Sequence, residues 1–594
     1  MQENSVDPAG PSSGLRRLRF WLPLIERFRP KEIQITLVLA GLAGFFGALG
    51  SLAFRQATEG MHWLFTGHFG AGLTESFARL PWWQRILVPT LGGAAAGWVL
   101  MITAHFVKQK RTSDYMEAVV IGDGILSARQ SLLKSLSALF SISSGASIGR
   151  EGPLVQLAAM LASALGRIAR VSSPVLRLLV ACGASAGIAS AYNAPVSGAL
   201  FVAEIVMGTT SMEVFGPLVC ASVVSTLTVR QFLGTDPLYT ITHFVLSSPA
   251  ETFVMLGLGC VCGLLSPLYL LMLRAVESWY SLWQAPPFLR LATGGLIVGT
   301  LAVWYPQVCG NGYSSVNAVL HGEWPWRELA IVLVLKLIAT SATFGSGAVG
   351  GVFTPTLFVG SSIGFLFGVV LQAAPALHGV QPSAFALVGM GAFLAAATRA
   401  PIMAIMLIFE VTLDYEVILP LMLACVVAYY TARGFRVPGL YSETLRRKGR
   451  WEFDSELRRM RVGDIMKTHP PSVQPEAAFD EICNRFALLR HNHLYVVDAN
   501  GRFCGVISLH DIKRFLSNPD LARFVIARDV MREEFPSLGP DDFLTTVFER
   551  FAHHHGERVP VLAGDGSRRL LGSVSKADAL LAFAEQPEIR NPSP

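Results

Sequence analysis

The stretch Gly149–Pro153, which reads GREGP, lies in the middle of one apolar half of this chain, and Gly351–Pro355, GVFTP, lies in the middle of the other. Each stretch places a glycine four residues before a proline. An Ala-Pro pair also stands nine residues before a glutamate in each half, at Ala194-Pro195 before Glu204 and at Ala400-Pro401 before Glu410. A membrane unit repeated with its Gly and Pro motifs is typical of transporters in which broken helices of two halves form the substrate site.

The composition divides the chain into a membrane part and a soluble part. Of its 594 residues 52% are hydrophobic and 15% are charged, against about 25% charged in ordinary soluble domains. The deficit is confined to residues 33–435, and the sequence after Arg446 has a soluble composition. We therefore predict a cytoplasmic segment over 1–31 and an all-α polytopic membrane domain over 32–450. Its two repeats would cover about 32–235 and 250–435.

Several apolar stretches are too short to cross a bilayer, which takes about 20 residues. Examples are 195–207 and 401–413, and Gly and Pro interrupt such stretches at matching positions in the two halves. Irregular backbone at membrane depth is tolerated where protein or a watery cavity covers it. The pattern therefore predicts helices that stop partway across the membrane. Close helix packing alone does not account for the matching offsets.

The net charge of +6 is explained by the membrane. Cationic residues precede the first span at Arg16, Arg17, Arg19, Arg27, Arg29 and Lys31, and follow the last at Arg433, Arg436, Arg446, Arg447 and Lys448. Positive flanks stay in the cytoplasm, so we predict a multi-pass protein of the inner membrane with both termini cytoplasmic, and no nucleic-acid partner.

Three backbone segments at helix starts are candidates for binding an anion. A helix N-terminus presents free N–H groups and partial positive charge, and a proline in the first turn fits there. The candidate residues are Gly149, Arg150 and Gly152 in the first half, Val352, Phe353 and Thr354 in the second, and Gly122, Asp123 and Gly124 before a helix near Ser127. Such a site holds an anion without a full positive side chain, which suits a conduit that must also release it.

Glu151 is a carboxylate in a site built for anions. It can occupy the site when charged and leave it when protonated, and an intramembrane ionisable residue is functional by default. We predict that Glu151 is the gate. The structural alternative is an ion pair with Arg150 or a helix cap.

Residues 460–517 and 525–585 form a second repeat, of mixed α/β character. Each copy is expected to hold a strand, Leu494–Val497 or Val559–Leu562, then a turn with glycine, a second strand and a helix. Each also has a serine three residues before an aspartate, Ser508 and Asp511 in the first copy and Ser575 and Asp578 in the second.

No metal or resident cofactor is expected. Neighbouring histidines, as in His553–His555, point in different directions on a helix, and the eight cysteines show no metal-knuckle spacing. The spans contain no nucleophile–base pair, so a membrane-embedded enzyme is disfavoured.

At Gly149–Pro153, Gly351–Pro355, Asn193–Pro195, Arg399–Pro401 and Tyr441 the sequence resembles the CLC family of chloride channels and proton-coupled chloride transporters. The resemblance covers nearly all of residues 30–450. It implies an inverted-repeat fold, a homodimer with one pore per subunit, and Glu151 as the gating glutamate. It also implies that the Tyr441 hydroxyl and the backbone amides of Val352 and Phe353 contact the central anion.

The tail resembles a pair of CBS domains. In nucleotide-binding members of that family the aspartate takes ribose hydroxyls and the Ser or Thr contacts phosphate. Ser508, Asp511, Ser575 and Asp578 are therefore candidates for binding an adenine nucleotide. The alternative is a pair that only stabilises the dimer.

Two positions depart from the CLC pattern. Asp123 stands where the family usually has serine, and an ionised carboxylate there would repel the central anion. Ile205 stands where coupled transporters commonly carry an inner proton-accepting glutamate, and isoleucine carries no proton. The sequence thus favours passive chloride conduction, gated by voltage or pH. The alternative is chloride/proton antiport by a different inner route, through Glu204 or Asp123.

Overall fold

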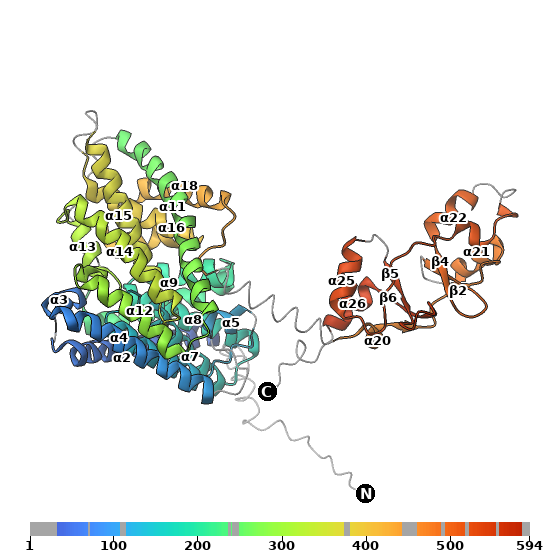
Figure 1. The fold of residues 1–594 in the computed structure, drawn as a ribbon, viewed down its shortest axis with the longest axis horizontal. Coiled ribbons are helices and arrows are strands. Elements are labelled where there is room, and N and C mark those ends of the chain that lie inside the picture. Colours follow the sequence, from blue (N-terminus) through green and yellow to red (C-terminus); the bar gives the residue numbers. More distant parts are fainter. Residues whose placement is uncertain are drawn as a thin grey trace, which may run out of the picture. The chain divides into compact units, whose positions relative to one another are not determined.

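The computed structural model describes residues 32–68, 70, 72–106, 114–120, 122–235, 239, 249–373, 380–441, 460–488, 493–516, 522–553 and 557–584. The chain divides into two compact units, 1–445 and 446–594, which we describe separately. Helices α2 to α18 belong to the first unit and the elements from α20 onward to the second (Figure 1). The N-terminal segment 1–31 lies outside the described residues.

The first half of the membrane unit is helical throughout. Its elements are α2 (Glu32–Thr66), α3 (Leu73–Arg79), α4 (Trp82–Phe106), α5 (Tyr115–Val120), α6 (Ala128–Ser143), α7 (Glu151–Ile168), α8 (Ser173–Tyr192), α9 (Pro195–Phe201), the π-helix η1 (Val202–Met207) and α10 (Met212–Leu233).

The second half repeats this series. Its elements are α11 (Pro249–Leu282), α12 (Pro287–Ala302), the 3₁₀ turn η2 (Pro306–Val308), α13 (Tyr313–Leu320), α14 (Trp326–Gly345), α15 (Phe353–Gln372), α16 (Pro382–Thr398), α17 (Pro401–Thr412) and α18 (Ile418–Gly434). Within the described residues of the chain, seven helices are long and apolar enough to cross a membrane and five apolar helices are shorter.

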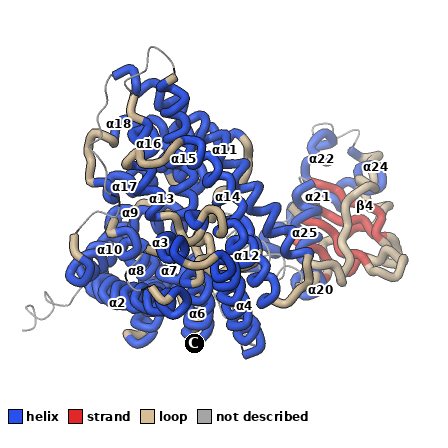
Figure 2. Tube along the Cα trace, turned by 60° about the vertical axis from the view of Figure 1, so that its left-hand side comes forward, coloured by secondary structure: helices blue, strands red, loops and turns tan. Residues whose placement is uncertain are grey.

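The two halves pack in the same pattern. In the first half α7 packs on α8, α2 on α10, and α8 on α10; in the second half α15 packs on α16, α11 on α18, and α16 on α18. Helices of the two halves also meet directly, α4 on α12 and α9 on α17, and the latter pair lies side by side in Figure 2. The predicted fold of duplicated halves with broken helices is thus confirmed.

The repeated Ala-Pro pairs begin the short helices α9 and α17. Asn193 and Arg399 end the preceding helices in the left-handed conformation, at φ 56° and 64°. Pro195 and Pro401 then occupy the first helical position, where the missing N–H would have no partner in any case. The same short turn therefore starts a new helix in each half.

A carboxylate from each half caps the short helix of the other. Glu410 accepts hydrogen bonds from the backbone N–H groups of Val196 (2.8 Å) and Ser197 (2.7 Å) and from the Ser197 hydroxyl (2.5 Å). Glu204 in turn accepts from the backbone N–H groups of Met403 (2.9 Å) and Ile402 (3.4 Å). The free N–H groups at a helix start need such partners, so these two carboxylates join the halves.

The tail contains two small sheets, with strand order β2-β3-β4 in one and β1-β6-β5 in the other. Its strands are β1 (Lys467–Thr468), β2 (Ser472–Val473), β3 (His493–Val497), β4 (Phe503–Ser508), β5 (Arg558–Leu562) and β6 (Leu570–Ser575). Its helices are α20 (Val462–Ile465), α21 (Phe479–Leu488), α22 (Leu509–Leu516), α24 (Ala527–Val530), α25 (Leu544–His553) and α26 (Lys576–Ala584). Hairpins β3–β4 and β5–β6 are antiparallel, and β1 of the first copy pairs with β6 of the second. Each of the two apolar cores contains residues of both copies, because Val525, Ala527 and Val530 join the core around β3 and β4 and Val462 joins the core around β5 and β6.

We predict that Glu410→Ala lowers the free energy of unfolding by about 2 kcal/mol, because the start of α9 loses its charged cap. Thermal unfolding in detergent, followed by size exclusion, measures the effect. Glu416→Ala removes an exposed glutamate next to α18 and is the matched control. Equal melting temperatures for the two variants would contradict a capping role for Glu410.

Candidate functional site

The repeated GREGP and GVFTP stretches meet each other through their backbones. Gly149 and Gly351 form an antiparallel bridge, in which the Gly149 N–H donates to the Gly351 carbonyl (2.6 Å) and the Gly351 N–H to the Gly149 carbonyl (2.9 Å). Helices α7 and α15 begin two residues later, at Glu151 and Phe353. The bridge therefore brings the N-terminal ends of two helices from different halves together, where they favour an anion.

The Glu151 carboxylate is buried at this meeting point, with the residue only 2% exposed. Its Oε1 accepts hydrogen bonds from the Tyr192 hydroxyl (2.9 Å) and from the Thr354 hydroxyl. Among the described residues its Oε2 has no hydrogen-bond partner. The carboxylate thus occupies a place between the two helix starts that an anion of similar size could take.

A cavity of about 300 Å³ opens beside Glu151. Among the predicted site residues, Glu151, Gly152, Val352 and Tyr441 line it. The Tyr441 ring packs edge-to-face on Phe201, another lining residue, with ring centroids 5.4 Å apart. We call this space the inner cavity.

The other predicted residues of the two stretches have different positions. Phe353 is buried behind the inner cavity, with its ring 5.3 Å from that of Tyr192. Thr354 reaches the site through its hydroxyl on Glu151. The Arg150 guanidinium lies over the Tyr313 ring, 5.6 Å from its centroid, and the residue lines a different cavity.

Gly122, Asp123 and Gly124 were predicted to contribute to the anion site, and the inner cavity does not support this prediction. These residues connect α5 to α6 and are not part of the lining of the inner cavity. The N–H groups of Gly122 and Gly124 donate to carbonyls at the end of α5, and Gly124 adopts φ 81°. The Asp123 carboxylate accepts from the Ile125 N–H (2.9 Å). The predicted helix near Ser127 is present as α6, which begins at Ala128, but the hydrogen bonds of Gly122 and Gly124 go to the end of α5.

The start of α5 lines the inner cavity instead, through Asp114, Tyr115 and Met116. The Asp114 carboxylate accepts from the Met116 N–H (3.2 Å) and so caps α5, and the Tyr115 N–H donates to Gln156 Oε1 (3.2 Å). The sequence held a signal for this start, because Asp114 stands three residues before Glu117 in the pattern of a capping box.

Glu204 lies in η1 and caps α17, as described above, and it is absent from the lining of the inner cavity. Its neighbour Ile205 packs against the apolar core. Glu204, one of the two carboxylates predicted as alternative proton carriers, therefore accepts hydrogen bonds from backbone N–H groups of the other half.

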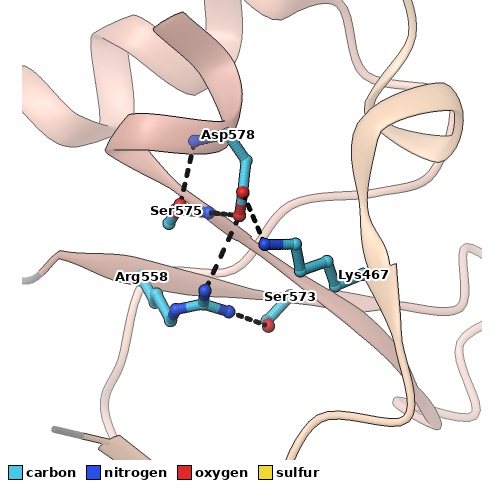
Figure 3. Close-up of polar contacts among 5 residues, drawn as sticks. All are labelled: Lys467, Arg558, Ser573, Ser575 and Asp578. Carbon is cyan, nitrogen blue, oxygen red and sulfur yellow. Dashed lines mark hydrogen bonds and ion pairs between the residues drawn. The ribbon is translucent and has the colours of Figure 1, made fainter. Parts of the chain in front are cut away.

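In the tail each predicted Ser–Asp pair caps the N-terminal end of a helix, α22 in the first copy and α26 in the second. Ser508 donates its hydroxyl to Asp511 (2.6 Å), which also pairs with Arg532 (2.5 Å). In the second copy the Ser575 N–H donates to the Asp578 carboxylate (3.2 Å) and the Asp578 N–H donates to the Ser575 hydroxyl (2.9 Å). Lys467 and Arg558 approach the same carboxylate at 2.8 and 3.8 Å (Figure 3).

Both tail aspartates have a pKa below the usual value. Burial by itself would raise the pKa, but for Asp511 the hydrogen bonds from Ser508 and Arg532 outweigh it, and for Asp578 those from Lys467 and Ser575 do so. Both carboxylates are thus held in the charged form, beside cationic side chains that could meet phosphate.

Comparison with known proteins identifies the class and then the family. A polytopic membrane protein with two packed repeats and an α/β tail matches the family described as "Voltage gated chloride channel" over residues 92–433, and the CBS domain over 462–518 and 527–585. The chain belongs to this chloride channel family and carries two CBS domains. The family consists of channels and transporters.

Relatives with similar sequences support the assignment. A ClcB-like protein of Ralstonia nicotianae is 50% identical over 415 residues, which cover 69% of this chain and 96% of that protein. The voltage-gated ClC-type chloride channel ClcB of Salmonella typhimurium is 40% identical over 413 residues, 68% of this chain and 98% of that protein.

Solved structures share the fold at lower identity. A slow cyanobacterial Cl⁻/H⁺ antiporter matches with a TM-score of 0.61 at 24% identity, over 70% of this chain and 97% of that one. A eukaryotic CLC transporter matches with a TM-score of 0.58 at 18% identity, over 91% of this chain and 97% of that one.

We predict that Gly149→Ala expels the Glu151 carboxylate from its seat. An added Cβ would lie 1.8 Å from Glu151 Oε2, and relieving such an overlap costs about 1–3 kcal/mol. A structure of the variant should show Glu151 detached from Tyr192 and Thr354. Gly60→Ala is the control, because its Cβ would meet nothing within 4 Å. An unmoved carboxylate with a broken Gly149–Gly351 bridge would contradict the prediction.

Proposed function

We propose that this chain carries chloride across the membrane through the inner cavity and that Glu151 is the gate. The observation that carries the proposal is the seat of Glu151 itself. A buried carboxylate with one unpartnered oxygen lies where two helix starts from different halves meet.

Chloride would take the place of the carboxylate when Glu151 withdraws. The hydroxyls of Tyr192 and Thr354, which now donate to Glu151 Oε1, would then be free to donate to the ion. Tyr441 lines the inner cavity beside them, and the backbone amides of Val352 and Phe353 begin α15. Apart from Lys134, which also lines the inner cavity, these are weak donors, and weak donors let the ion leave as readily as it enters. The residues that would hold the anion are Gly149, Arg150, Gly152, Val352, Phe353, Thr354 and Tyr441.

Passive conduction is favoured over proton coupling. Ile205 cannot carry a proton, and the Glu204 carboxylate is occupied by the start of α17. Chloride/proton antiport, which the name of the cyanobacterial structure describes for that protein, would need Glu204 to release this cap in each cycle.

The setting of the protein follows from the same proposal. The membrane domain would span 32–450, with repeats at about 32–235 and 250–435 and CBS domains at 460–517 and 525–585. It would act as a homodimer in the inner membrane, with both termini cytoplasmic. It would have no enzymatic activity and no resident cofactor in the membrane domain.

Chloride efflux from liposomes with simultaneous recording of external pH tests the proposal. We predict chloride efflux without matched proton movement for the native chain. For Glu151→Gln we predict that opening of the gate no longer depends on pH, because the neutral amide does not titrate and has no charge that holds it in the anion site. Proton movement that Glu204→Gln abolishes would show antiport through Glu204. Absence of efflux with all anions tried would overturn the transport proposal.

We further propose that the CBS pair binds an adenine nucleotide. Asp511 and Asp578 would accept ribose hydroxyls, and Ser508 and Ser575 would contact phosphate. Lys467 and Arg558, which now approach Asp578, could turn to the phosphates when ribose takes the carboxylate.

Calorimetry of the purified chain with ATP and AMP checks this proposal. Asp578→Asn should weaken binding about tenfold, because one charged hydrogen-bond acceptor is lost. Asp565→Asn, in the exposed turn between β5 and β6, is the control and should bind like the native chain. No heat with either nucleotide would leave the pair with a stabilising role only.

A further inference from the structure

A second cavity, of about 450 Å³, lies next to the start of α7 and shares no lining residue with the inner cavity. We call it the outer cavity. The two cavities are adjacent along the chain, because Glu151 lines the inner cavity and its neighbour Arg150 lines the outer one. The outer cavity also receives the end of α2 and the segment Cys309–Ser314 of the other half.

Two histidines of the outer cavity are held in the same way. His62 Nδ1 lies 3.2 Å from the Ser143 carbonyl and His68 Nδ1 lies 2.8 Å from the Thr66 carbonyl. Since a carbonyl can only accept, each Nδ1 carries a proton and each neutral ring keeps a bare lone pair at Nε2. His62 is only 8% exposed, and its Nε2 has no partner among the described residues. Protonation would turn both Nε2 atoms into hydrogen-bond donors.

Further positive groups surround the same space. The Arg150 guanidinium is fixed over the Tyr313 ring, and α13 begins at Tyr313 on the cavity wall. Lys336 is fully buried and does not line the cavity, and its Nζ donates to the carbonyls of Val308 (2.8 Å), Cys309 (3.2 Å) and Gly310 (2.7 Å).

The negative group of this lining is partly neutralised. Glu59 lines the outer cavity, but it pairs with Arg55 at 3.3 Å. The charged and titratable groups around the two imidazoles are thus Arg150, Glu59 with Arg55, Tyr313, and Lys336 behind the loop. Their balance favours an anion, and protonation of the imidazoles adds to it.

We propose that the outer cavity is a second anion site, which takes a hydrated monovalent anion such as chloride and binds it more tightly when His62 and His68 are protonated. The inference rests on the proposed transport function. The ion would wait there, next to Arg150, before it enters the seat of Glu151.

The test measures the chloride concentration that gives half-maximal flux at about pH 7.5 and about pH 4.5, with equal pH on both sides so that no proton gradient contributes. Every chain in the test carries Glu151→Gln, so that the gate itself does not titrate. With both histidines present this concentration should fall about tenfold at the lower pH, because a protonated imidazole adds positive charge and an Nε2–H donor to the cavity that Arg150 also lines. In the double variant His62→Asn/His68→Asn it should change less than about twofold. Asparagine retains an N–H for each carbonyl.

The control is His321→Asn. His321 has the same Nδ1-to-carbonyl contact, to Asn317 at 2.8 Å, but it is exposed at the end of α13 and does not line the outer cavity. It should show the full shift. If the double variant does not fold, His68→Asn alone, at a half-buried site, should reduce the shift to about threefold.

The outcomes separate this inference from the transport proposal. A double variant with the full shift in half-maximal chloride overturns the outer site and leaves transport intact. If no variant transports chloride, calorimetric titration of the purified chains with chloride at about pH 4.5 decides. Heat that depends on the two histidines supports the outer site, and absence of heat from the native chain overturns it.

Discussion

The pairing of Gly149 with Gly351 is the constraint on which the rest of the membrane unit depends. Two hydrogen bonds fix the starts of α7 and α15 against each other, and the two chain segments run in opposite directions at this bridge. Glycine is needed because the Glu151 carboxylate fills the space where a side chain on Gly149 would be. The fold and the gate therefore depend on the same backbone contact.

The two halves also complete each other chemically. Glu204 and Glu410 stand at equivalent positions, and each satisfies N–H groups of the opposite half. The corresponding offset in the sequence, nine residues after Pro195 and Pro401, is explained by this exchange of caps. Glu204, a candidate proton carrier in place of Ile205, thus has a structural role in this chain.

Much of this arrangement was readable in the sequence, because the duplicated Gly and Pro motifs mark helix starts by local chemistry. These motifs predicted a helical membrane domain with broken helices, and they placed Glu151 at a helix start. The third helix start at the cavity did not follow from them: Gly122–Gly124 precedes α6 as expected, but the start of α5, which Asp114 caps, lines the inner cavity instead. The partners of Glu151 are Tyr192 and Thr354, which lie far apart in the sequence, and only the folded structure brings the end of α8 and the start of α15 to the same carboxylate.

The exchanged caps have a consequence for biosynthesis. Val196 and its cap Glu410 are 214 residues apart, and a ribosome adds about 5–20 residues per second. The first half therefore remains in the bilayer for roughly 10–40 seconds with the start of α9 uncapped. During that interval its unsatisfied N–H groups need water, lipid headgroups or the insertion machinery as partners. Insertion of the second half brings Glu410 to these N–H groups, so the second half completes the folding of the first.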